Sequence, residues 1–189
     1  VYGFFQVAGE FAIESSTKPV TLSDKSTVNV DLLTIGASHV DAFAGLNGGT
    51  ANRMGVALGD VEFGLALMSE QLPLNSPAAA RNWTSLQATA GSAAIVGAGD
   101  LVMRASDISV SINQTSVLNG AVADYAAGAT DLEIATGITD TLQLDMLGTS
   151  GKQLQAAAHV VVDLYGFVGV EGDFAILTRT ANVTLPDLA

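Results

Sequence analysis

The sequence predicts an all-β protein whose strands are stacked along an elongated tandem repeat. Apolar and polar residues alternate with a period of two along several segments, which is typical of strands that have one buried face. The chain also returns to its own opening sequence, since Tyr2-Gly3-Phe4 recurs as Tyr165-Gly166-Phe167, and such a return indicates a tandem repeat. An elongated β-solenoid-like structure or a stacked β-ladder accounts for both observations, and β-sandwich modules in tandem are the alternative.

The expected strands follow this alternation in chain order. It is clearest at residues 27–32, 107–113 and 141–146, where Val, Ile, Leu or Met occupies every second position. The 20 glycines divide the strands at turns or bulges. A loop is expected at 47–52, where the sequence is Asn-Gly-Gly-Thr-Ala-Asn. At most one short helix is expected, near residues 77–82, because a proline suits the first turn of a helix and a preceding Asn or Ser can cap it.

The two copies of the repeated segment align without a gap. Tyr2–Ile13 returns as Tyr165–Ile176, and 13 of the 23 positions between 2–24 and 165–187 are identical. The later matches pair Thr17, Val20, Thr21, Leu22 and Asp24 with Thr180, Val183, Thr184, Leu185 and Asp187. We therefore interpret residues 1–163 as one full period and residues 164–189 as the start of the next.

A finer, threefold division of the period is an open alternative. Short related motifs divide it into stretches near 1–53, 54–98 and 99–163, and their anchor residues are Phe11, Phe63, Ile108 and Phe174. These matches lie in a background rich in Ala, Gly and Val, where coincidence is an equally good explanation. If the division holds, each period consists of three stacked strand-turn units.

The composition excludes several classes of function. The 7 Lys and Arg residues face 19 Asp and Glu residues, giving a net charge of −12, so no basic patch is available for nucleic acid or for anionic membrane headgroups. There is no Cys, and hence no disulfide or thiolate metal site. No apolar stretch is long enough for a membrane-spanning helix, so membrane insertion is not expected.

No catalytic constellation is visible, and we expect no enzyme and no cofactor. His39 and His159 are the only histidines; neither lies in a metal-binding pattern, and His159 fits a strand position whose ring has a polar partner. The weak calcium candidates are Asp60, Asp100 and Asp107, which lie beside glycine turns; a solvated acidic surface explains them better, because no calcium-loop motif is present.

The sequence resembles the tandem repeats of giant secreted bacterial surface proteins of the adhesin and haemolysin-like kind. The resemblance rests on Tyr2–Ile13 and Thr27–Ser38, joined by Val61–Met68 and Asn82–Ala90, and it spans most of the chain. It implies an extracellular, cell-surface location and a fibrous role. The chain departs from the haemolysin-like pattern because the calcium-binding nonapeptides are missing.

We therefore expect a structural module of a long extracellular fibre or adhesin stalk, whose partners are neighbouring copies of itself. The residues predicted to join modules by strand stacking are Tyr2, Phe4, Val7, Phe11, Ile13, Tyr165, Phe167, Val170, Phe174 and Ile176. In separate subunits, residues 165–187 of one could instead occupy the place of 2–24 in the next. The alternative function is binding of carbohydrate or another surface ligand through Trp83, Tyr125 and the acidic loops, with Trp83 as a stacking platform for sugars.

Overall fold

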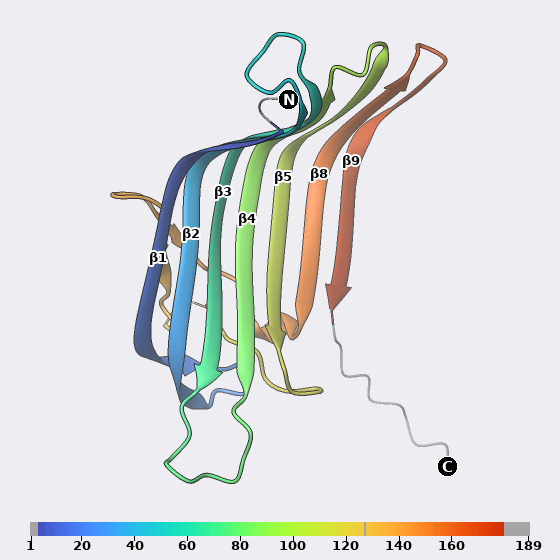
Figure 1. Ribbon diagram of the computed structural model, residues 1–189. Helices are drawn as coiled ribbons and strands as arrows, with labels where there is room; N and C mark the ends of the chain where they lie inside the picture. Colours follow the sequence, from blue (N-terminus) through green and yellow to red (C-terminus); the bar gives the residue numbers. More distant parts are fainter. Residues whose placement is uncertain (1–3, 127, 180–189) are drawn as a thin grey trace, which may run out of the picture.

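The chain folds into one long antiparallel sheet, and the computed structural model describes residues 4–126 and 128–179 of it (Figure 1). Seven strands lie side by side in the order in which they occur along the chain. They are β1 (Phe5–Thr21), β2 (Thr27–Leu46), β3 (Met54–Glu70), β4 (Asn82–Val96), β5 (Leu101–Thr115), β8 (Gln153–Leu164) and β9 (Val168–Arg179). The all-β prediction is confirmed, but the described residues form no closed solenoid, because each long strand pairs antiparallel with the long strands next to it along the chain.

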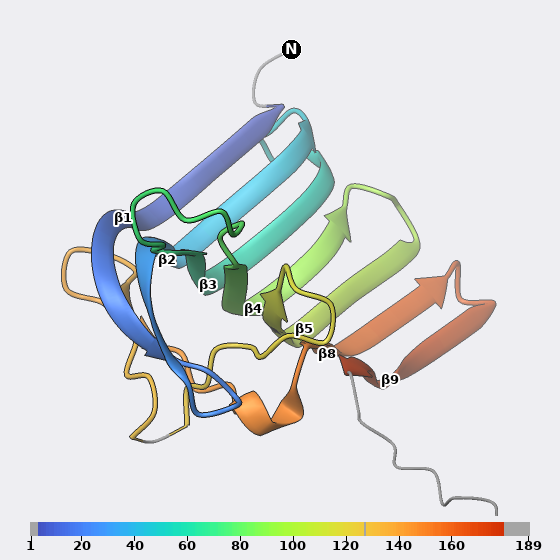
Figure 2. The same cartoon turned by 90° about the horizontal axis from the view of Figure 1, so that it is seen from below.

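The segment between β5 and β8, residues 116–152, forms a lobe on one side of this sheet. It contains a second, two-stranded sheet, made of β6 (Glu133–Ala135) and β7 (Thr141–Gln143), and the short 3-10 helix η1 (Gly148–Ser150). Figures 1 and 2 show the lobe, in yellow to orange, lying on one side of the lower part of the sheet. The sheet therefore has two unlike faces.

We call the covered side the lobe face; it carries Val20, Val30 and Met68 in the core beneath the lobe. From the lobe, Leu132, Ile134, Leu144 and Met146 complete this core. Trp83 is buried in this core, and its indole nitrogen donates a hydrogen bond of 2.9 Å to the carbonyl of Ala121. Since Trp83 and Tyr125 are both buried, neither ring is available as a stacking platform for glycans.

A buried carboxylate fastens the lobe to the β1–β2 turn. Asp124 is almost wholly buried, and its carboxylate accepts hydrogen bonds from Lys25 Nζ at 2.8 Å and from the amides of Gly148 and Ala126. Burial alone would raise the pKa of Asp124, but the lysine and the two amides outweigh it and hold the pKa below the ordinary value. The lobe is thus held by an ionised group whose loss would leave polar partners unsatisfied.

Left-handed backbone interrupts the long strands at about the same level across the sheet. His39, Asp60 and Asp107 have φ values of 50°, 53° and 51°, and the strand registers shift beside Gly9, His39 and Asp107. Such bulges bend the strands that carry them. Figure 1 shows the strands curving near their upper ends, so each strand has a lower part on the lobe side and an upper part beyond the bend.

The predicted short helix near residues 77–82 is wrong. Residues 71–81 form an irregular loop between β3 and β4, and Asn82 already belongs to β4. The guanidinium of Arg81 makes two hydrogen bonds, of 2.8 and 2.6 Å, to the Glu70 carboxylate, which draws the end of the loop back to the sheet. The few residues that remain are too short for a stable helix. None of the helical segments in the described residues has the length and apolar character needed to span a membrane.

Candidate functional site

The two edges of the sheet are formed by the two copies of the repeated sequence. β1 occupies one edge and β9 the other, and β9 carries the segment that repeats β1, with Phe174 at the position of Phe11. Six antiparallel steps separate the two strands, so they run in the same direction. An exposed strand edge presents free backbone donors and acceptors, which can pair with a further strand.

The two edge strands also turn matching residues to matching faces. Successive pairing across the sheet places Glu10 of β1 and its counterpart Asp173 of β9 on the lobe face. The same pairing places Phe11 and its counterpart Phe174 on the opposite side. β1 and β9 are therefore equivalent in sequence, in direction and in the faces to which their side chains point.

The predicted joining residues lie at these edges wherever the structure describes them, and all of those described are exposed. Three are on β1, three on β9, one precedes β1 and two lie in the β8–β9 turn: Val7, Phe11 and Ile13; Val170, Phe174 and Ile176; Phe4; Tyr165 and Phe167. Tyr2 lies outside the described residues, as do the later matches at 180–187. Whether these residues join modules stays a prediction.

The sheet is staggered by two residues from one edge to the other. Phe11 pairs with Ala37, and following the partners strand by strand leads to Ile176, which is the counterpart of Ile13 rather than of Phe11. In the upper part, Val7 leads in the same way to Gly172, the counterpart of Gly9. Because both parts give the same stagger, it is a property of the whole sheet.

The three stretches of the finer, threefold division correspond to pairs of long strands. The stretches near 1–53, 54–98 and 99–163 each contain one pair of long strands, β1–β2, β3–β4 and β5–β8, the last with the lobe between its strands. The anchors Phe11, Phe63, Ile108 and Phe174 lie on the first strand of each pair and on β9. The common origin of the three stretches stays a prediction.

His159 forms a polar cluster with the edge strand β9. Its Nδ1 lies 2.8 Å from Asp173 Oδ1, and its Nε2 lies 3.4 Å from Glu171 Oε1. The hydrogen bond to Asp173, and next that to Glu171, raises the pKa of His159. The counterpart of Asp173 on β1, Glu10, instead accepts a hydrogen bond of 3.1 Å from the lobe amide of Ile138.

The sequence already contained a signal for the His159 cluster. His159 and Asp173 are equally far from Gly166 in the β8–β9 turn, so a hairpin centred there pairs them directly. We predicted that the ring of His159 has a polar partner, but not which residue supplies it. The partner depends on strand register, which alternation alone does not determine.

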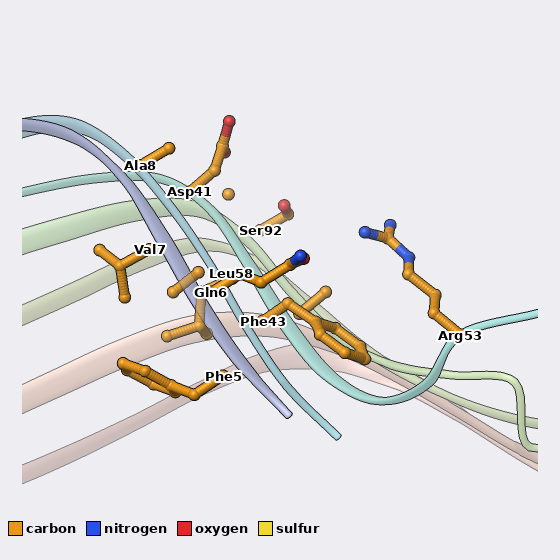
Figure 3. A pocket seen from close by; sticks show the side chains of 12 residues that line it. Phe5, Gln6, Val7, Ala8, Asp41, Phe43, Arg53, Leu58 and Ser92 are labelled. Carbon is orange, nitrogen blue, oxygen red and sulfur yellow. The ribbon is translucent and has the colours of Figure 1, made fainter. Parts of the chain in front are cut away.

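A hollow lies at the upper end of the sheet, over β1 to β4 (Figure 3). Its volume is about 750 Å³, and it is widely open to solvent. Arg53 stacks over the ring of Phe43 with its guanidinium carbon 5.6 Å from the ring centre, and Asp41 accepts a hydrogen bond of 3.2 Å from the amide of Asp60. Gln6 and Ser92 are its other polar linings. This mixed, shallow surface holds no histidine, so it lacks a nucleophile–base pair of the Ser–His kind.

The three calcium candidates do not come together. Asp60 lies on β3 and Asp107 on β5, with β4 between them, and Asp100 lies in the β4–β5 turn. Among residues 4–126 and 128–179, no three His, Cys, Asp or Glu side chains form a group suited to a metal ion. The acidic residues of the described part are thus dispersed over strands and turns.

No family model matches the chain, and no similar protein is found among curated sequences or solved structures. The most distinctive features of its surface are the two equivalent edges and the sheet face opposite the lobe.

Proposed function

We propose that the chain is a structural module of a long fibre in which one antiparallel sheet continues from period to period. Each period contributes six long strands, β1 to β5 and β8 in this chain, and β9 is the first strand of the following period. The observation that carries the proposal is the equivalence of β1 and β9 in sequence, direction and facing. Continuation of the sheet would also remove the exposed edges, which otherwise invite uncontrolled pairing.

The direction of the edge strands favours a continuous chain over separate subunits. Two copies laid side by side in the same orientation would bring β9 of one against β1 of the other in parallel, because both strands run the same way. Antiparallel continuity between separate copies in the same orientation would require β9 of one to displace β1 of the other. A tandem chain needs no displacement, since a strand equivalent to β2 would follow β9.

The residues beneath the lobe support the same arrangement. Val20 and Leu22 are fully buried there, and the second copy of the sequence carries Val183 and Leu185 at the corresponding positions. A lobe of the following period would cover them. Glu10 would then lie between His159 of the preceding period and its own lobe, because its counterpart Asp173 already pairs with His159.

The resemblance to repeats of bacterial surface proteins supports an extracellular, cell-associated fibre, and the charge of −12 would keep such a polymer soluble. The role is mechanical reach, with neighbouring periods of the same protein as partners.

The proposal is tested by extending the chain by one period. Ala189 corresponds to Ser26, so residues 27–189 appended after Ala189 continue the repeat in phase. We expect every second amide of Val168–Arg179, those facing away from β8, to exchange with deuterium at least ~10-fold more slowly in the extended chain, because they become paired. The control carries an extension of the same length and composition in scrambled order. Equal exchange of β9 in both extended chains would refute the proposal.

A further inference from the structure

The side of the sheet opposite the lobe is apolar across all seven strands. We call it the open face; one row of it runs through Ile13, Ile35, Leu65, Leu86, Ile112 and Leu154, which pair in succession from β1 to β8. No segment of the described chain lies over this face, and Ile13, Leu67 and Ile176 on it are exposed. An uncovered apolar surface of this extent marks an interaction site.

Charge is almost excluded from this face below the bend. Asp31 is the one ionisable residue among its described positions there, and it lies at the lower margin, where its carboxylate accepts a hydrogen bond of 2.7 Å from Gln71. The lobe face is more highly charged: a single strand, β1, places Glu10, Glu14 and Lys18 on it. A chain with a net charge of −12 repels its own copies, so only an uncharged face allows two copies to meet closely.

One row of the open face is also corrugated in a way that suits a second copy. It alternates large and small side chains on successive strands: Phe11, Ala37, Phe63, Ala88, Val110, Ala156 and Ile176. Ala37 is fully buried although no other layer of the described chain covers it, and its cross-strand partners are Phe11 on one side and Phe63 on the other. Along this row, large side chains about 9.6 Å apart thus alternate with small ones, since neighbouring strands are about 4.8 Å apart. A second copy shifted by one strand would place the large side chains of this row against small ones.

We infer that two copies of this chain associate through their open faces, as two sheets packed face to face. Two further rows of this face, which contain Val61 and Leu67, lie on either side of the two named rows, and the Leu67 row ends at β5. Seven strands about 4.8 Å apart and four rows about 6.8 Å apart cover at most roughly 900 Å² on each copy. A stable protein interface buries about 800 Å² on each partner. The surface is therefore large enough for a dimer. It uses side chains on one face of the sheet, whereas the proposed function uses backbone pairing at the sheet edges.

The test is the oligomeric state of the 189-residue chain by analytical ultracentrifugation from about 1 to 300 µM, a range that covers ordinary dimer affinities. We expect a dimer that Ile176→Glu weakens at least ~10-fold, because the substitution places a carboxylate in the apolar interface. Leu177→Glu is the matched control: Leu177 is the next residue of β9, is 54% exposed where Ile176 is 65% exposed, and faces the lobe side. Leu67→Glu tests the centre of the face.

Circular dichroism and thermal unfolding verify that each variant folds. If Leu67→Glu does not fold, the comparison of Ile176→Glu with Leu177→Glu is sufficient to test the inference. Both residues are exposed on the edge strand β9, so neither substitution should prevent folding. A wild-type chain that stays monomeric over the whole range overturns the inference. Equal weakening by Ile176→Glu and Leu177→Glu also overturns it, since that result means association through the β9 edge. A dimer unaffected by either open-face substitution overturns it as well.

Discussion

Adding one period should lengthen the molecule by a fixed step that the sheet itself determines. The perturbation is the in-phase extension of the chain by residues 27–189, once and then twice. Each extension adds six long strands, which at about 4.8 Å per strand span about 29 Å. The two-residue stagger displaces the next period by about 6.8 Å along the strands, so the full step is roughly 30 Å.

Small-angle X-ray scattering of chains with one, two and three periods measures this step. We expect the maximum dimension to grow by about 30 Å per period, and electron microscopy to show one lobe at each step. Separate globular modules of one period would each be about 40 Å across, from the radius of gyration of a domain of that length, and would add at least that much. Steps as large as such a module, with flexible links between periods, would refute the continuous sheet.

Three further predictions concern single residues. Gly36→Ala should lower the thermal midpoint and cost about 1–3 kcal/mol, because a Cβ there collides with the Ala135 carbonyl of the lobe, whereas Gly169→Ala, with open space around it, should cost nothing. The hydrogen bonds of His159 to Asp173 and Glu171 raise its pKa, so they stabilise the β8–β9 pair fully at pH values below 6.5, the ordinary pKa of histidine. The stability of the protein should therefore fall as the pH rises through the raised pKa. Thermal melts at pH 6 and 9 measure this dependence, and His159→Gln should abolish it. Asp124→Ala should lower the free energy of unfolding, measured in urea at pH 7, by about 3 kcal/mol. The wild-type protein should lose the same contribution as the pH falls through the depressed pKa of Asp124, which lies below the ordinary value of 3.8.

Local sequence was enough to predict the class of fold. The alternation at 27–32 and 107–113 lies within β2 and β5, and the glycine-rich segment at 47–52 is the β2–β3 loop. At 141–146 the same pattern yields only the three residues of β7 and then irregular chain. There the apolar residues Leu144 and Met146 face the core of the lobe, and burial rather than sheet pairing explains their spacing.

The arrangement of the sheet could not be predicted, because it depends on contacts between distant segments. The repeat alone suits a coiled solenoid as well as a flat ladder, since both stack strands at a regular spacing. What decides between them is that each long strand pairs antiparallel with the long strand that follows it, either through a turn or loop, as β8 and β9 do at Tyr165 and Gly166, or across the lobe, as β5 and β8 do. The open face depends on the lobe, which covers only one side of the sheet; the alternation at 141–146 does not show on which side the lobe packs.

The two proposed surfaces would reinforce each other in a long chain. An interface of roughly 900 Å² supports a modest association for one period, but a continuous sheet repeats that face once per period in fixed orientation. Once the first pair of faces has met, the next pair meets at a high effective concentration, so affinity rises steeply with the number of periods. The lobe keeps the charged lobe face outward in such a pair of arrays. In such a fibre, an open-face contact that is modest for one period would, when repeated in register, be sufficient to bind two fibres together.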